Sequence, residues 1–133
     1  GCRSMTTPTI GYIGERLDLL IRQGATLGPF ACTLTNPDGS PVNLTGATIR
    51  GQIRKKPADT TVVASLAVNV LDAVNGLYSF ALDAATTATI VAGLDVTKPE
   101  SLYVWDMELA DSLGRVIPLH WGDVRVHREV TRA

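Results

Sequence analysis

The two histidines of the sequence, His120 and His127, could act as metal ligands or general bases, because imidazole changes protonation near neutral pH. They flank a predicted turn at Gly122–Asp123, where the carboxylate of Asp123 would be a further ligand. Tetrahedral zinc needs four ligands, and the sequence contains neither an HxH nor an HExxH spacing. On alternating strands both imidazoles fall opposite the apolar positions, so we expect them to point outward or to be partly covered at an interface, and to bind no metal.

A nucleophilic site would be a second kind of chemistry. Cys32 lies in phase with Phe30 and Leu34, which predicts a small buried hydrophobe and not an activated thiolate. Ser112 belongs to the sequence Asp-Ser-Leu-Gly, whose residue types a tight turn explains. The glycines fit no phosphate-binding motif. We therefore expect no catalytic residue, no cofactor and no enzymatic activity.

Asp106 and Glu108 could be a pair of catalytic carboxylates. They are two positions apart on one predicted strand, so both side chains point to the same face. Carboxylates at the separation that glycosidases use normally come from different strands. We therefore expect a solvent-exposed pair, with Arg115 or Arg125 across the hairpin as ion partners.

Four basic residues gather at the end of one predicted strand: Arg50, Arg54, Lys55 and Lys56. The aromatic residues on which bases would stack are absent between them. The chain has 12 basic and 13 acidic side chains and a net charge of −1, without the basic excess that drives phosphate binding. We expect a protected strand end and no nucleic-acid partner. No apolar run reaches the ~18–20 residues of a membrane helix, so we expect no membrane partner.

The elements that must position these side chains are predicted by alternation. In residues 15–22, Leu17, Leu19 and Ile21 lie on one face and charged residues on the other, as in a half-buried strand. The same period recurs between turn signals at ~8–12-residue spacing, which favours a sandwich or barrel. The predicted strands are residues 15–22, 27–35, 47–54, 61–70, 77–83, 103–109, 117–121 and 124–126. We expect an immunoglobulin-like or jelly-roll β-sandwich of about eight strands.

One segment has a different composition. Residues 84–92 are rich in alanine, follow Asp83 as a possible N-cap and precede Gly93 as a stop. They predict one short helix that crosses between the sheets, followed by a loop over residues 93–100.

The first 15 residues are expected to lie outside the sandwich, which would be a single domain over residues 16–133. The sequence GCRS before Met5 is interpreted as a remnant of recombinant expression, followed by an N-terminal arm. On this interpretation Cys32 is the only native cysteine. We then expect no internal disulfide and no requirement for an oxidising compartment.

Several ordered motifs resemble a family of small proteins of tailed bacteriophages. They cover residues 16–132 and are Gln23–Gly24, Asp38–Gly39, Leu44–Thr45–Gly46, Ile53–Arg54, Asp106–Glu108–Leu109, Gly114, Gly122–Val124–Val126 and Val130–Thr131–Arg132. The chain is also similar to the N-terminal β-sandwich of phage baseplate upper proteins. Trp121 departs from this pattern, because a smaller residue is expected before the glycine.

The resemblance implies a non-enzymatic virion protein, assembled in the host bacterial cytoplasm. It would be an adaptor of the tail, baseplate or fibre that docks to other virion proteins, as a homo-oligomer of three or six copies. A trimeric capsid-decorating protein and a carbohydrate-binding sandwich are the alternatives. Aromatic and arginine side chains dominate many interfaces, so we expect contacts at Tyr12, Trp121, Arg125 and His127.

The stretch between residues 36 and 46 is expected to be a structural corner and not an active site. Asp38 and Gly39 have the residue types of a turn. Leu44 would close one end of the sandwich, and Gly46 would supply a backbone geometry that other residues resist.

Overall fold

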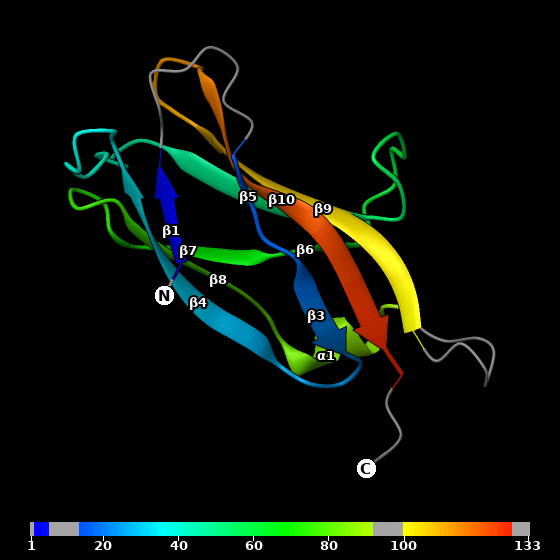
Figure 1. Cartoon of the computed structure of the whole chain (residues 1–133). Helices are drawn as coiled ribbons and strands as arrows, with labels where there is room; N and C mark the ends of the chain where they lie inside the picture. The colour runs from blue at the N-terminus through cyan, green and yellow to red at the C-terminus, as the bar shows by residue number, and fades with distance from the viewer. Residues whose placement is uncertain (1, 6–13, 92–99, 129–133) are drawn as a thin grey trace.

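The computed structural model describes residues 2–5, 14–91 and 100–128 of the chain. Within these ranges, ten strands form two facing sheets, and one short helix lies at one end of the sandwich (Figure 1). The first sheet contains, in spatial order, β1 (Cys2–Met5), β4 (Leu27–Thr35), β8 (Leu77–Leu82) and β7 (Ala67–Asp72). The second contains β2 (Glu15–Arg16) and β3 (Leu19–Arg22), then β10 (Val116–His127), β9 (Glu100–Ala110), β5 (Thr48–Arg54) and β6 (Ala64–Ser65). The predicted all-β sandwich is confirmed.

The strand order is that of an immunoglobulin-type sandwich rather than a jelly roll. Strands β4, β8 and β7 correspond to strands B, E and D of that fold, and β10, β9, β5 and β6 to G, F, C and C′. The short strand β3 runs parallel to β10 at the edge of the second sheet. The hydroxyl of Tyr103, near the start of β9, donates to the carbonyl of Val91, in the manner of the tyrosine corner of such domains.

The core follows the predicted alternation in most strands. In β5, Ile49, Gly51 and Ile53 face inward, and in β3 Leu19 and Ile21 do. The largest fully buried side chains come from both sheets and the connecting segments: Tyr78, Phe80, Ile21, Leu34, Leu44, Ile53, Leu82, Ile90, Met107, Leu109, Leu119 and His120.

The strand predicted over residues 61–70 is in fact two strands in different sheets. Strand β6 pairs with β5 and strand β7 pairs with β8. The chain changes sheets at Leu66, which is buried between them and whose amide donates to the carbonyl of Gly51. Alternation alone does not reveal such a crossing, because an inward residue on either sheet points to the same core.

The predicted helix is shorter than expected, since α1 spans Ala84–Ala88 and its C-cap is Thr89. Its beginning is as predicted, because the Asp83 carboxylate accepts a hydrogen bond from the Thr86 amide at 2.8 Å. Hydrogen bonds from the Thr86 side chain, and secondly from its amide, lower the pKa of Asp83. Residues 92–99, which include the predicted stop at Gly93, lie outside the described residues.

The corner after β4 is built as its residue types suggest. The Asp38 carboxylate accepts hydrogen bonds from the amide and hydroxyl of Ser40, at 2.9 and 2.6 Å. Leu44 is buried and its amide donates to the carbonyl of Ala73, which ties the corner to the β7–β8 turn. Gly46 adopts a φ of 79°, a conformation that side chains with a Cβ disfavour.

The last strand differs most from its prediction. Strand β10 continues through Gly122 and Asp123, where a turn was expected. Its register with β9 shifts between Pro118 and His120, so that Leu119 and His120 are both buried. Such a bulge adds a residue to one strand and reverses the in-and-out phase that follows. His120 is only 1% exposed, and its predicted outward orientation is wrong.

The first residues of the chain bear on the expectation that Cys32 forms no internal disulfide. Residues Cys2–Met5 form β1, which pairs in parallel with β4 and places Cys2 opposite Cys32 in the register. Cys32 is buried, as predicted, but it is disulfide-bonded. The expectation of no internal disulfide is therefore wrong. It depended on reading Cys2 as a remnant of expression.

Candidate binding face

The outer face of the six-stranded sheet, which points away from the other sheet, gathers most of the exposed functional side chains. Residues paired across neighbouring strands share a face, so the registers define this surface. The outer face comprises Arg16, Leu20, Arg22, Arg50, Gln52, Arg54, Leu102, Val104, Asp106, Glu108, Trp121, Asp123, Arg125 and His127.

Three of the four predicted contact residues lie on this face. Trp121, Arg125 and His127 occupy outward positions of β10 beyond the bulge, and Asp123 lies at the outward position between Trp121 and Arg125. Tyr12 lies outside the described residues. Because β10 is the second strand from the edge, these side chains have neighbours on both sides.

Arg125 is the centre of an exposed row that crosses three strands. It is paired with Leu20 on β3 and with Leu102 on β9. Leu20 is 64% exposed and Leu102 is 60% exposed, and Arg125 is exposed between them. We call these three residues the docking row. Two exposed leucines beside an arginine combine apolar area with a strong hydrogen-bond donor, a mixture typical of protein interfaces.

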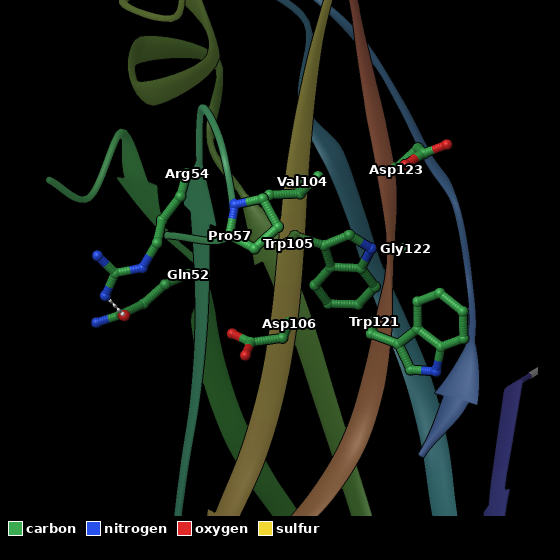
Figure 2. A pocket seen from close by; sticks show the side chains of 9 residues that line it. All are labelled: Gln52, Arg54, Pro57, Val104, Trp105, Asp106, Trp121, Gly122 and Asp123. Carbon is green, nitrogen blue, oxygen red and sulfur yellow. Dashed lines mark hydrogen bonds between the residues drawn. The ribbon is translucent and has the colours of Figure 1, made fainter. Parts of the chain in front are cut away.

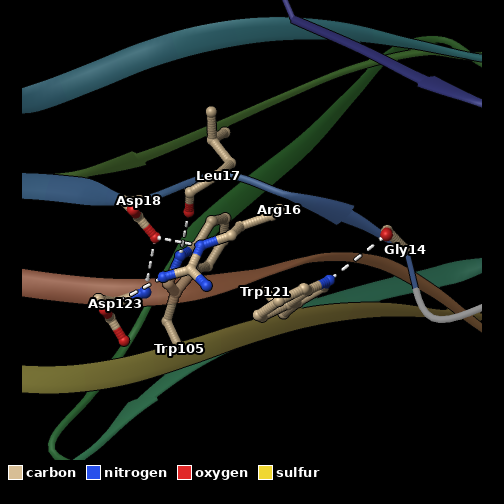
Figure 3. A network of polar contacts seen from close by, with 7 residues as sticks. All are labelled: Gly14, Arg16, Leu17, Asp18, Trp105, Trp121 and Asp123. Carbon is tan, nitrogen blue, oxygen red and sulfur yellow. Dashed lines mark hydrogen bonds and ion pairs between the residues drawn. The ribbon is translucent and has the colours of Figure 1, made fainter.

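Trp121, near the middle of β10, belongs to a polar network (Figure 3). The Arg16 guanidinium lies 5.0 Å from the centre of the indole ring and 3.2 Å from carboxylate oxygens of both Asp18 and Asp123. The indole Nε1 donates to the carbonyl of Gly14 at 3.4 Å. Asp18 also accepts from the amide of Asp123, which is the main reason that the pKa of Asp18 is lowered. The network holds the indole in place at the protein surface.

A close approach of the chain to Gly122 makes this network possible. The amide of Leu17 donates to the carbonyl of Trp121 at 2.8 Å, and the carbonyl of Leu17 accepts from the Trp105 indole at 2.7 Å. A Cβ added to Gly122 would lie 2.5 Å from that carbonyl oxygen. Glycine at this position therefore lets the segment between β2 and β3 lie directly against β10.

A pocket of about 370 Å³ opens on the outer face beside Trp121 (Figure 2). It is lined by Gln52, Arg54, Pro57, Val104, Trp105, Asp106, Trp121, Gly122 and Asp123. Arg54 is fixed in the wall, because it donates to the Gln52 side chain at 2.7 Å and to the carbonyl of Asp59 at 2.9 Å. In the part of the chain that the structure describes, the Asp106 carboxylate makes no hydrogen bond or ion pair.

A second hollow of about 290 Å³ continues from the first along β5 and β9. It shares Gln52, Arg54 and Asp106 with the pocket and adds Arg50 and Glu108, whose charged groups are 4.0 Å apart. The two hollows together form a groove that is aromatic at one end and polar at the other.

The predicted ion partners of Asp106 and Glu108 are wrong. Glu108 faces Arg50 on β5, and Arg115 pairs with Asp111 at 2.7 Å within its own turn. Strand β5 lies on the other side of β9 from β10, and the sequence alone does not specify that neighbour.

The buried histidine lies directly beneath this face. His120 stacks against Trp105 with ring centres 5.9 Å apart, and lies 5.7 Å from Phe80. Its Nε2 is 2.7 Å from the Tyr78 hydroxyl, and its Nδ1 is 4.0 Å from the Glu15 carboxylate. Burial lowers the pKa of His120 to about 4 and raises the pKa of Glu15. The imidazole is therefore neutral at physiological pH.

Residues 2–5, 14–91 and 100–128 contain neither a cluster of metal ligands nor a helix that could span a membrane. Within those ranges, no three histidine, cysteine, aspartate or glutamate side chains are placed to hold a metal ion. No described helix is both long and apolar enough to cross a membrane.

Sequence reasoning missed Leu20, Leu102 and the groove residue Gln52 as functional candidates, and interpreted Asp106 only as a solvent-exposed carboxylate. The available signal was phase, since Leu20 is an apolar residue at an outward position between inward Leu19 and Ile21. The groove had no comparable signal, because its residues come together only through the pairing of β5, β9 and β10.

Comparison with known proteins gives little further information. The chain matches no protein-family model, and no curated protein matches it. Among solved structures, it is similar to the bradyzoite-specific antigen BSR4 from Toxoplasma gondii, with 11% sequence identity and a TM-score of 0.35. That match covers 98% of this chain and 49% of the antigen, so the chain spans about half of its length. A similarity at this level supports no conclusion about function.

Proposed function

We propose that this chain is a non-enzymatic structural protein of a bacteriophage virion, where it acts as a tail, baseplate or fibre adaptor by docking to protein subunits. The resemblance of residues 16–132 to small proteins of tailed phages supports this setting. The observation that carries the docking role is the docking row Leu20–Arg125–Leu102 on the outer face.

The docking row offers a partner apolar area from two leucines and the hydrogen-bond donors of one arginine. Fully burying one leucine side chain contributes about 1.5–3 kcal/mol, so Leu20 and Leu102 would together stabilise a complex appreciably. Arg125 between them can bind a carboxylate with two parallel hydrogen bonds. Arg22 and His127 lie next to this row and add further donors. The contacting surface of the partner subunit is therefore expected to carry apolar and acidic side chains.

We further propose that copies of the chain assemble with one another through this row, as a trimer or a hexamer. The test is the solution mass of the full chain, measured by size-exclusion chromatography with light scattering at two protein concentrations. The wild-type chain is expected to form a trimer or hexamer. Leu20→Asp and Arg125→Glu are expected to yield monomers with unchanged circular-dichroism spectra, because both side chains are exposed.

A matched control separates the docking row from exposed apolar surface in general. Val74 is 62% exposed, close to the exposure of Leu20, but lies in the β7–β8 turn, away from the outer face. Val74→Asp is expected to leave the mass unchanged. A wild-type monomer at both concentrations would refute self-assembly. If Val74→Asp dissociated the assembly as fully as the docking-row variants, the assignment of the interface to the docking row would be refuted. A trimer would favour capsid decoration, and a hexamer a tail ring.

A further inference from the structure

The groove beside Trp121 is separate from the docking row and has a chemistry of its own. Its aromatic end, of about 370 Å³, falls within the ~300–1,000 Å³ of small-ligand pockets. Val104 and Trp105 line it on β9, Trp121 and Gly122 line it on β10, and Pro57 lies at its β5 side (Figure 2). These groups offer a ligand apolar surface at the centre of a polar sheet face.

The polar groups of the groove are largely fixed before any ligand binds. Arg54 is held by Gln52 and by the carbonyl of Asp59. Asp123 is held by Arg16 at 3.2 Å. Groups that are already oriented lose little conformational entropy on binding, which favours recognition by hydrogen bonds.

Asp106 is the acceptor that the groove leaves available. It lies between Gln52 on β5 and Trp121 on β10 in the registers of the sheet. Among the described residues its carboxylate has no hydrogen bond or ion pair. It also lines both hollows, so a ligand in either hollow would meet it. A carboxylate in this position accepts hydrogen bonds from hydroxyl groups strongly.

The balance of charge argues against an ionic ligand. An anion would meet Asp106 and Glu108 as well as Arg50 and Arg54, and a cation would meet both arginines. A neutral ligand with many hydroxyl groups avoids both repulsions, since hydroxyls donate to carboxylates and accept from guanidinium and amide groups. Its apolar C–H surface can contact the indole ring of Trp121. A sugar ring combines these properties.

We propose that this groove binds a neutral oligosaccharide, with one sugar ring in the aromatic hollow and the next ring in the polar hollow. Trp121 contacts the first ring, Asp106 accepts hydroxyl hydrogen bonds at the boundary, and Arg50 and Gln52 contact the second. This site uses β5, β9 and the beginning of β10, whereas the docking row uses Leu20, Leu102 and Arg125.

The test is a glycan array of neutral and acidic bacterial and mammalian oligosaccharides, probed with the labelled full chain. Hits are then titrated by tryptophan fluorescence. We expect neutral glycans of two or more rings to be retained. Asp106→Ala and Gln52→Ala should each weaken binding about tenfold or more. Asp106→Ala removes hydrogen bonds from the ligand to a charged group, and Gln52→Ala removes hydrogen bonds to an amide. Both side chains point outward, so the circular-dichroism spectrum should not change.

Arg125→Glu provides the control on the same face. It should abolish the proposed assembly and leave the glycan affinity unchanged, so that the two proposals fail independently. The oligosaccharide site is overturned if no glycan on the array is retained, if retention is confined to sulfated or uronate-bearing glycans, or if Asp106→Ala binds as tightly as the wild-type chain.

Discussion

Acidification should destabilise this fold through His120, beginning near pH 6.5. The imidazole is enclosed by Trp105, Phe80 and Tyr78, and burial lowers its pKa from 6.5 to about 4. The unfolded chain binds a proton on this residue near pH 6.5, whereas the folded chain resists protonation until about pH 4. The stabilisation is therefore fully present above pH 6.5 and is lost as the pH falls toward 4.

The magnitude follows from the same values. A decrease of the pKa from 6.5 to about 4 corresponds to about 3 kcal/mol, since a tenfold change in proton affinity is about 1.4 kcal/mol. Small domains have total stabilities of about 5–15 kcal/mol, so the loss is large. Glu15, the nearest carboxylate, has a raised pKa and a partly exposed side chain, so it offsets only a small part.

The assay is urea unfolding at a series of pH values from 7.5 to 4.5, above the range in which the aspartates with lowered pKa values titrate. The free energy of unfolding of the wild-type chain should decrease by roughly 1.4 kcal/mol per pH unit below 6.5. The double variant His120→Phe with Tyr78→Phe removes the titrating group without leaving its hydrogen-bond partner buried and unpaired. Its stability should not change over this range.

His127, the other histidine of the chain, lies on the outer face of β10 and provides the control substitution. His127→Gln should keep the pH dependence of the wild-type chain. The reasoning is refuted if the wild-type stability is constant between pH 6.5 and 4.5, or if the double variant retains the same slope.

Three further substitutions test other parts of the structure by urea unfolding and circular dichroism. Gly122→Ala should lower the free energy of unfolding by about 2 kcal/mol or more, because the added Cβ would lie 2.5 Å from the carbonyl oxygen of Leu17. An unchanged urea midpoint would contradict that close approach. Leu44→Ala should lower the free energy of unfolding by about 2–5 kcal/mol, because Leu44 is 2% exposed and its truncation leaves a cavity at the corner. A decrease of less than about 1 kcal/mol would show that the corner collapses around the shortened side chain. Trp121→Ala should lower the free energy of unfolding by less than about 1.5 kcal/mol, since it removes a contact with Arg16 at the surface. The variant should keep the circular-dichroism spectrum of the folded chain, and loss of that spectrum would place Trp121 in the core.

The core could be predicted from the sequence because burial on a strand has a period of two. Ile49, Ile53, Tyr78 and Phe80 all lie inside, as their alternation indicates. The method failed at His120, because the bulge after Pro118 reverses the phase and no residue type marks it. Alternation also could not locate the change of sheet at Leu66, which preserves the inward phase.

The binding face could be predicted only in part. Trp121 and Arg125 stood out by residue type alone, whatever their neighbours. The docking row and the groove depend on which strands are adjacent, because Leu20 meets Arg125 across β3 and β10, and Gln52 meets Asp106 across β5 and β9. These pairings join residues about 50 to 100 positions apart, and a local pattern carries no information about them.

The central proposal is that assembly buries the docking row. Hydroxyl-radical footprinting measures the resulting loss of solvent accessibility directly. The oxidation rates of Leu20 and Leu102 would be compared with those of Val74 and Leu113, which are also exposed, at low and high protein concentration. Protection of Leu20 and Leu102 at high concentration, with constant rates at Val74 and Leu113, is the result that the proposal predicts. Constant rates at all four residues, or protection confined to Val74 and Leu113, would contradict it.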